Sequence, residues 1–265
     1  MELISVDRNK CKRDGICIAE CPFALIAESD DGGFPVARKA APRICINCGH
    51  CLAVCPHGAL SFKGKGAESC LPVDHKLQPT PQAAAQFLRN RRSIRTYKEK
   101  SVPREVLEEI IDISRWAPSA KNVQPVKWLV IESAAEMKKL IDLTIDCLRL
   151  HKAYPGVVSA WEQEGRDLVL RDAPHLIIAY ASNKALKAEV DCTISLTYLD
   201  LAAHAMGLGT CWAGIFLGAA LIHPPIVEAL ELPEGHNIQG ALMLGYPKYR
   251  YPRIPQRNPA KIIWR

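Results

Sequence analysis

The sequence lacks long apolar runs, so neither a membrane span nor a secretory signal is expected. No stretch of its 265 residues approaches the ~20 consecutive apolar residues that a spanning helix needs. The first residues, Met1 to Asp7, have neither a basic start nor an apolar core of signal-peptide length. We therefore expect a soluble cytoplasmic protein with no membrane partner.

The sequence also lacks a strong excess of charge of one sign. It has 34 Lys and Arg against 28 Asp and Glu, a net charge of +6, and no basic arm, which argues against a nucleic-acid partner. With 48% hydrophobic and 23% charged residues, the composition is that of an ordinary globular protein and excludes disorder, collagen and coiled coil. The length allows one large domain, or a small domain joined to a medium one.

Cysteine, in contrast, is abundant and clustered. Seven of the 11 cysteines fall in the first 55 residues, and Cys70, Cys147, Cys192 and Cys211 are scattered. A reducing compartment disfavours a disulfide framework, so clustered cysteines there indicate metal binding.

The spacing of the cluster is specific. Cys45, Cys48, Cys51, Cys55 and Pro56 form the C-x2-C-x2-C-x3-C-P run of a bacterial ferredoxin, which binds iron–sulfur clusters. A second copy lies 34 residues upstream, where Cys11, Cys17, Cys21 and Pro22 align with Cys45, Cys51, Cys55 and Pro56.

This repeat predicts two clusters with crossed ligation, because the fourth cysteine of each run binds the other cluster. The second cluster, of the 4Fe-4S type, takes Cys21, Cys45, Cys48 and Cys51, and the first takes Cys11, Cys17 and Cys55.

The fourth ligand of the first cluster falls at Asp14, where the repeat has no cysteine. Asp14 is either an oxygen ligand to a labile iron in a 4Fe-4S cluster, or a residue beside a 3Fe-4S cluster, or simply part of a tight turn with Gly15. Cys70 is an alternative ligand. Zinc is the alternative metal for the whole set, but structural zinc sites close at four ligands and fit seven cysteines poorly.

By composition and apolar pattern, the chain divides into a ferredoxin-like unit over residues 1–65, a linker over 66–82 rich in Gly and Pro, and a larger unit over 83–265. Short strands are expected near 4–6 and 59–62. In the larger unit, periodicity predicts helices over 83–88, 103–117, 136–150 and 191–206, and buried strands over 127–131, 175–180 and 241–244. The class is α+β, a small sheet covered by helices.

The segment Arg91-Arg92-Ser93-Ile94-Arg95 gathers guanidinium groups around one hydroxyl, which suits a phosphate. Downstream come the loop 117–125, the segment Gly207–Gly214, and Leu244-Gly245-Tyr246-Pro247 with a basic tail. In order and spacing these segments resemble the nitroreductase family of FMN enzymes. The whole chain is similar to a ferredoxin–nitroreductase fusion.

The resemblance implies which residues contact FMN. Arg91, Arg92, Ser93 and Arg95 match the motif that holds the phosphate, the ribityl chain and the pyrimidine edge, and either Arg253 or Arg257 completes the phosphate site. The remaining expected contacts lie near the flavin ring or reach it across a dimer interface, and they are Pro118, Ser119, Ala120, Asn122, Gln124, Trp212, Ala213 and Gly214. Backbone N–H groups of the last three are expected to bond flavin N5.

The expected function is therefore that of an FMN-dependent oxidoreductase, with iron–sulfur clusters relaying electrons to or from the flavin. The chemistry is flavin-based, so no catalytic side chain is assigned. The expected acceptors are small molecules such as nitroaromatics or quinones, the donor is NAD(P)H or an external ferredoxin, and the family resemblance implies a homodimer. The alternatives are a non-catalytic electron carrier, and a flavin reductase or metabolite-specific reductase on the same fold. The region between Leu150 and Asp172 is expected to shape the pocket.

Overall fold

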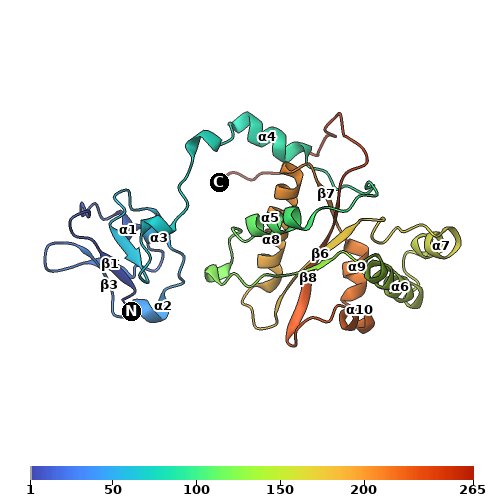
Figure 1. Ribbon diagram of the computed structural model, residues 1–265, viewed down its shortest axis with the longest axis horizontal. Helices are drawn as coiled ribbons and strands as arrows, with labels where there is room; N and C mark the ends of the chain where they lie inside the picture. The colour runs from blue at the N-terminus through green and yellow to red at the C-terminus, as the bar shows by residue number, and fades with distance from the viewer. Residues whose placement is uncertain (1) are drawn as a thin grey trace. The chain divides into compact units, whose positions relative to one another are not determined.

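The computed structural model describes residues 2–265 (Figure 1). The chain divides between Gln78 and Pro79 into two compact units. Within the described residues, no helix combines the length and the apolar character needed to cross a bilayer. The units are described separately below.

The N-terminal unit is built on two short antiparallel strand pairs. The expected strands are present as β1 (Ile4–Val6) and β4 (Leu60–Phe62), which pair with each other. A second pair, β2 (Ile26–Glu28) with β3 (Pro35–Ala37), was not anticipated, because three-residue strands carry too little periodicity to recognise. Short helices connect them: α1 (Ile16–Ala19), α2 (Ala41–Ile44) and α3 (His50–Ala53). A small core of Ile4, Cys17, Ile26, Leu52 and Leu60 holds the unit together.

The sequence repeat is also a repeat of backbone conformation. Gly15 precedes α1 with φ 71°, and Gly49, 34 residues later, precedes α3 with φ 73°. Arg13 and Asn47 have positive φ values at the same offset, 58° and 55°. This left-handed conformation, which Gly adopts at little cost, turns the chain tightly between successive cysteines.

The segment that the sequence marks as a linker contains two short 3-10 turns, η1 (Ala67–Ser69) and η2 (His75–Leu77). Helix α4 (Pro81–Asn90) then begins the second unit, with Pro at its first position. The Thr80 side chain caps α4 by accepting a hydrogen bond from Ala83 N at 3.1 Å.

The C-terminal unit contains an antiparallel sheet in the order β5-β6-β8-β7. The predicted strands at 127–131, 175–180 and 241–244 are confirmed as β5 (Lys127–Ile131), β6 (His175–Ser182) and β8 (His236–Gly245). Strand β7 (Gly209–Trp212) was not predicted, because it is four residues long and lies in a glycine-rich segment.

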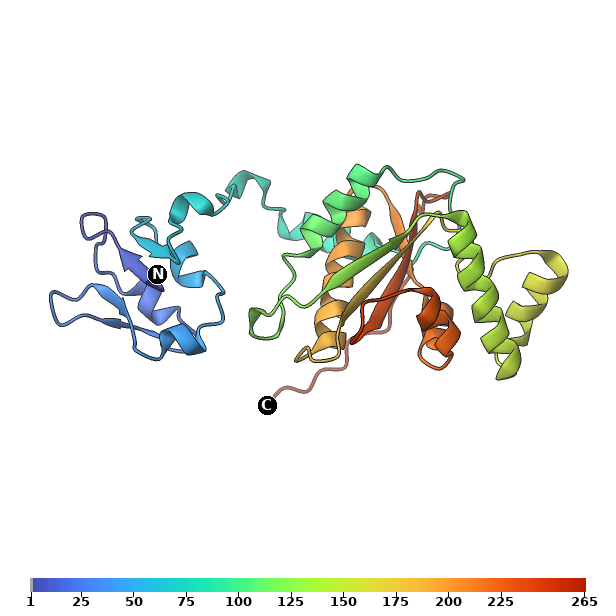
Figure 2. The ribbon, with the colours of Figure 1, turned by 60° about the horizontal axis from the view of Figure 1, so that its bottom comes forward.

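Helices cover both faces of this sheet, and the predicted α+β class is confirmed (Figure 2). Helices α5 (Arg104–Ser114) and α8 (Ala188–Ala205) pack on one face, over a core that includes Leu107, Ile177 and Leu196. The other face packs against α6 (Ala134–Leu150), α9 (Gly214–Ala220) and α10 (Pro224–Ala229), and α7 (Pro155–Glu164) packs on α6. Helices α7, α9 and α10 were not anticipated from the sequence.

Candidate functional site

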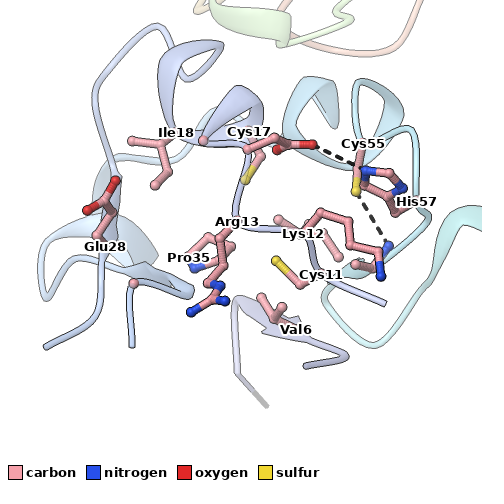
Figure 3. Close-up of a pocket in the computed structure, with 15 residues that line it drawn as sticks. Val6, Cys11, Lys12, Arg13, Cys17, Ile18, Glu28, Pro35, Cys55 and His57 are labelled. Atoms are coloured by element: carbon pink, nitrogen blue, oxygen red, sulfur yellow. Dashed lines mark hydrogen bonds and ion pairs between the residues drawn. The ribbon is translucent and has the colours of Figure 1, made fainter. Parts of the chain in front are cut away.

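Three thiols of the N-terminal unit surround one cavity of about 450 Å³. Figure 3 shows Cys11, Cys17 and Cys55 pointing toward this hollow. Cys55 comes from the second half of the repeat and the other two come from the first half. Asp14 lines the same cavity, at the position where the repeat would place a fourth thiol.

A second cavity, of about 410 Å³, is lined by the other four cysteines, Cys21, Cys45, Cys48 and Cys51. Its remaining walls are largely apolar and include Ile4, Leu25 and Phe62. The structure thus brings together the same two sets of residues that crossed ligation predicts. The ligand roles themselves stay predictions.

Across residues 2–265, no group of three or more Cys, His, Asp or Glu side chains is found that could hold a single metal ion. Burial, with the neighbouring Cys48 thiol, raises the pKa of Cys51 to about 11. A positively charged metal core would offset this penalty by stabilising the thiolates.

Backbone amides point at the last cysteine of each run. Leu25 N donates to Cys21 Sγ at 3.2 Å, and Ala59 N donates to Cys55 Sγ at 3.4 Å. The two donors are related by the 34-residue repeat, so both predicted clusters receive an equivalent N–H···S bond. Such bonds help to set the reduction potential of iron–sulfur centres.

Asp14 has a more complex environment than a simple turn residue. One carboxylate oxygen accepts a hydrogen bond from Ile16 N at 3.2 Å, and the other lies 3.6 Å from His57 Nε2. The carboxylate is therefore oriented at the cavity wall, and an iron atom bound to this oxygen would compete with His57 for it.

The C-terminal unit has a basic cavity of about 1030 Å³. Arg91, Arg92, Lys98 and Arg250 line it, with Asp200 as the opposing carboxylate. Arg92 donates through Nη2 to Arg89 O at 2.7 Å, but its Nε is buried and finds no partner in the described chain. A buried donor without an acceptor is costly, and a phosphate oxygen would satisfy it, so the residues fit an anionic cofactor such as FMN.

The predicted arginine motif is tied to the other nitroreductase-like segments by backbone hydrogen bonds. Ile94 N donates to Thr210 O at 2.8 Å, beside a bridge between Ser93 and Thr210. Farther along, Lys98 N donates to Tyr246 O at 2.9 Å. Three segments that are far apart in the sequence are thus neighbours at this end of the sheet.

Asp200 of α8 connects two of these segments through its side chain. Its carboxylate lies 3.3 Å from Arg91 Nη1 and accepts a hydrogen bond from the Thr210 hydroxyl. Arg91 is thereby oriented by a carboxylate on a rigid helix. Sequence reasoning missed Asp200 because its spacing within α8 marks it only as a polar residue of an otherwise apolar helix.

The loop 117–124 lies at a different cavity, of about 460 Å³, which Pro118, Ser119 and Gln124 line together with Asp191 and Ser195. The loop is internally bonded: Gln124 N donates to Ser119 Oγ at 2.9 Å, and Gln124 Nε2 donates to Asn122 Oδ1 at 3.0 Å. Neither this loop nor Ser93, Arg95 and Trp212 is among the residues that line the basic cavity.

The segment 212–214 begins at the last residue of β7. Trp212 is 40% exposed, whereas Ala213 is buried and its N–H donates to Ala241 O at 3.0 Å. The N–H of Ala213 is therefore engaged within the sheet, and the expected bond from this segment to flavin N5 stays a prediction for the neighbouring N–H groups. Gly214 begins α9, where a first-turn N–H has no helical partner.

The C-terminal arginines are placed differently from one another. Arg253 and Arg257 are exposed and are absent from the lining of the basic cavity, whereas Arg250 lines it. Sequence reasoning missed Arg250 and Lys98. The signal for Arg250 was its place in the basic tail just after Pro247, and for Lys98 its place shortly after the arginine motif.

Three cysteines and His175 lie in the packed interior of this unit. Cys147, Cys192 and Cys211 are buried in apolar surroundings, and burial with the neighbouring Asp191 raises the pKa of Cys192 to about 12. His175 accepts a hydrogen bond from Val102 N at 2.9 Å, and burial lowers its pKa.

A thiol-rich unit with two cavities and an α+β unit with a basic cavity define a redox protein of two parts. Comparison with protein-family models agrees: the model of the nitroreductase family matches residues 88–246, and that of the 4Fe-4S dicluster domain matches residues 9–60. The chain therefore belongs to the nitroreductase family of oxidoreductases and carries a 4Fe-4S dicluster domain at its N-terminal side. The predicted fusion is confirmed.

Individual relatives are more distant. A 4-nitrobenzoate reductase of a Nocardioides species is 27% identical over 215 residues, which cover 66% of this chain and 84% of the relative. An FMN reductase [NAD(P)H] of Bacillus subtilis is 29% identical over 175 residues, covering 64% and 69%. A crystal structure of a nitroreductase with bound FMN from Bacteroides fragilis matches with a TM-score of 0.57 at 22% identity, covering 68% of this chain and 98% of that one, and shows the shared fold.

Proposed function

We propose that the chain is an FMN-dependent oxidoreductase whose N-terminal unit holds two iron–sulfur clusters and relays single electrons to or from the flavin. The observation that carries the proposal is the presence, in one chain, of two cysteine-lined cavities and a basic cavity with a buried, unsatisfied guanidinium nitrogen in the part described, residues 2–265. The names of relatives, a 4-nitrobenzoate reductase and an FMN reductase [NAD(P)H], support small aromatic acceptors and a nicotinamide donor.

The proposed ligand sets follow the two cavities. Cys21, Cys45, Cys48 and Cys51 hold a 4Fe-4S cluster. Cys11, Cys17 and Cys55 hold the first cluster, and Asp14 supplies its fourth ligand in the 4Fe-4S form and lies beside an open corner in the 3Fe-4S form. Carboxylate oxygen is a harder ligand than thiolate, so this corner loses iron more easily.

When bound, FMN supplies hydride and one-electron chemistry, and iron–sulfur clusters supply one-electron transfer. The chain's own residues bind and orient these groups. Arg91 and Arg92 would neutralise the phosphate, with Arg250 and Lys98 beside them. On the family resemblance, Ser93 and Arg95 would hold the ribityl chain and pyrimidine edge, although they do not line the basic cavity. Residues of the loop 117–124, together with Trp212 and the N–H of Gly214, approach the ring.

The assembly and the partners are proposed on family resemblance. We expect a cytoplasmic homodimer with an FMN site in each half, Arg253 or Arg257 contributing to phosphate binding, and a donor that is NAD(P)H or an external ferredoxin. The division of the chain into units that end and begin near residue 78 supports the proposed domains, 1–65 and 83–265, with 66–82 joining them.

The test is anaerobic purification followed by measurement of FMN, iron and acid-labile sulfide per chain. NADH, NADPH and reduced ferredoxin are then compared as donors, with visible and EPR spectra reporting which centre is reduced. Cys48→Ser is expected to lower iron and the rate of ferredoxin-driven flavin reduction, whereas Cys70→Ser, an exposed cysteine outside both cavities, leaves them unchanged.

Two results would contradict the proposal. Little flavin with stoichiometric zinc would refute the cofactor assignment. Reduction of the protein without turnover of 4-nitrobenzoate or a quinone above the rate of free FMN would favour an electron carrier over an enzyme.

A further inference from the structure

Asp191 is a buried carboxylate that the proposed chemistry does not use. It lies in the first turn of α8 and is only 3% exposed. Its Oδ1 accepts a hydrogen bond from Ala120 N at 2.9 Å. Its Oδ2 is buried and has no hydrogen-bond partner in the described part of the chain. A buried charge is expensive, although a position in the first turn of a long helix favours negative charge.

The loop 117–124, which Asp191 contacts, lies at the surface of its unit. No side chain in 117–124 is fully buried, and one side of the loop borders the cavity of about 460 Å³. Lys121, Asn122 and Gln124 have φ values of 51°, 54° and 50°, a backbone region that residues with a side chain rarely adopt. A backbone of this kind persists only where its surroundings fix it.

Helix α8 supplies that fixation from one face. Ser195 lies one turn after Asp191, and its hydroxyl donates to Ser114 O at 3.1 Å, at the end of α5. The two α8 side chains therefore hold the chain on both sides of Pro118: Ser195 before the loop and Asp191 inside it. The contact from Asp191 spans 71 residues of sequence.

We propose that Asp191 is a positioning residue that fixes the loop 117–124 in the conformation in which it meets the flavin. This inference rests on the proposed function, because the loop is expected to approach the FMN ring. Asp191 acts through the N–H of Ala120 and not by touching the cofactor.

The test compares Asp191→Ala, which removes the acceptor, with Asp191→Asn, which keeps an oxygen acceptor for Ala120 N–H and removes the charge. Asp146→Ala is the matched control, because Asp146 is an exposed carboxylate of α6 paired with Arg149. Hydrogen exchange of the peptide 117–124 in the flavin-free protein reports the loop directly. FMN affinity and the visible flavin spectrum report the consequence for the site.

In Asp191→Ala, the amide hydrogen of Ala120 is expected to exchange at least about tenfold faster than in the wild type, because its hydrogen bond to the carboxylate is lost. This variant is also expected to bind FMN at least about tenfold more weakly. Asp191→Asn is expected to restore both to near wild type, and Asp146→Ala to change neither. Unchanged exchange in Asp191→Ala would overturn the proposal, as would faster exchange with unchanged FMN affinity, or an Asn variant as defective as the Ala variant.

The donor side gives a second test that does not depend on the folding of Asp191→Ala. Ala120→Pro removes the N–H at the first residue of a 3-10 turn, and Ser119 before it is extended at φ −138° and ψ 156°, which suits a following proline. Ala120→Ser keeps the N–H and serves as the control. Because Ala120 is itself an expected flavin contact, the readout of this test is hydrogen exchange at residues 121–124: faster exchange in the Pro variant alone supports the proposal, and equal exchange in the two variants overturns it. If the wild-type protein binds no FMN, the proposed function fails, while hydrogen exchange still decides whether Asp191 holds the loop.

Discussion

Gly209 gives the most direct test of how the arginine motif is packed. A Cβ built on Gly209 would lie 2.4 Å from Ile94 Cγ1, 2.7 Å from Ile94 Cβ and 2.9 Å from Ile94 Cγ2. These distances are far below normal contact, and Ile94 cannot swing aside easily, because a β-branched side chain has few rotamers. Gly209→Ala therefore forces β7 and the arginine motif apart.

The expected cost is that of overpacking, about 1–3 kcal/mol. For a unit of this size, each kcal/mol lowers Tm by about 2–4 °C, so we expect Gly209→Ala to lower Tm by roughly 2–12 °C. Because Ser93 and Arg95 flank Ile94, FMN affinity is expected to fall as well. Thermal unfolding followed by circular dichroism and FMN titration measure the two effects.

Gly218 provides the matched control, since it lies within α9 and a Cβ there meets nothing within 4 Å. Gly218→Ala is expected to stabilise the protein by about 0.5–1 kcal/mol through the loss of chain entropy in the unfolded state. In Gly209→Ala, adding Ile94→Ala is expected to cost less than the sum of the single variants, because the clash is removed. Equal Tm values for the two glycine variants, or strict additivity with Ile94→Ala, would refute the reasoning.

Three further predictions concern single groups. Asp14→Cys supplies a thiolate at the first cavity, so any three-iron EPR signal of the oxidised protein is expected to disappear; its persistence at wild-type intensity would show that position 14 does not face iron. Arg92→Met removes the Nε, which is buried and has no partner within residues 2–265. The variant is therefore expected to leave the flavin-free protein at least as stable while weakening FMN binding at least about tenfold, and a large loss of stability instead would identify Arg92 as a structural residue. His175 has a lowered pKa in the folded protein, so the unfolded state takes up the proton first and stability falls as the pH drops below about 6.5; in urea titrations His175→Gln, which keeps an acceptor for Val102 N, is expected to flatten this slope, and an unchanged slope would rule out His175 as its source.

The N-terminal unit could be predicted in detail because its information is local. The spacing of the cysteines and the glycines at Gly15 and Gly49 fix tight turns within a few residues, so the repeat in the sequence becomes a repeat of backbone conformation. The pair β2 and β3 was missed for the opposite reason, since three residues carry too little pattern.

The C-terminal unit was predictable at the level of its long helices and central strands, which have clear apolar periodicity. Strand β7 and the helices α7, α9 and α10 were not predicted, because short elements depend on their tertiary neighbours more than on their own sequence. The same limit applied to the site. The arginine motif was visible, but Lys98, Arg250 and Asp200 join it only because separate segments meet at one end of the sheet.

The order of residues along the chain was enough to reveal a cysteine repeat of the iron–sulfur type followed by a nitroreductase-like unit, because metal ligation and phosphate recognition need particular side chains at short, fixed spacings. Only the folded structure decided that Lys98 and Arg250 line one cavity with the arginine motif, that the N–H of Ala213 bonds within the sheet, and that Asp191 reaches across 71 residues to the loop 117–124. These contacts join groups far apart in sequence, and their geometry depends on how whole helices and strands pack, which no local pattern encodes.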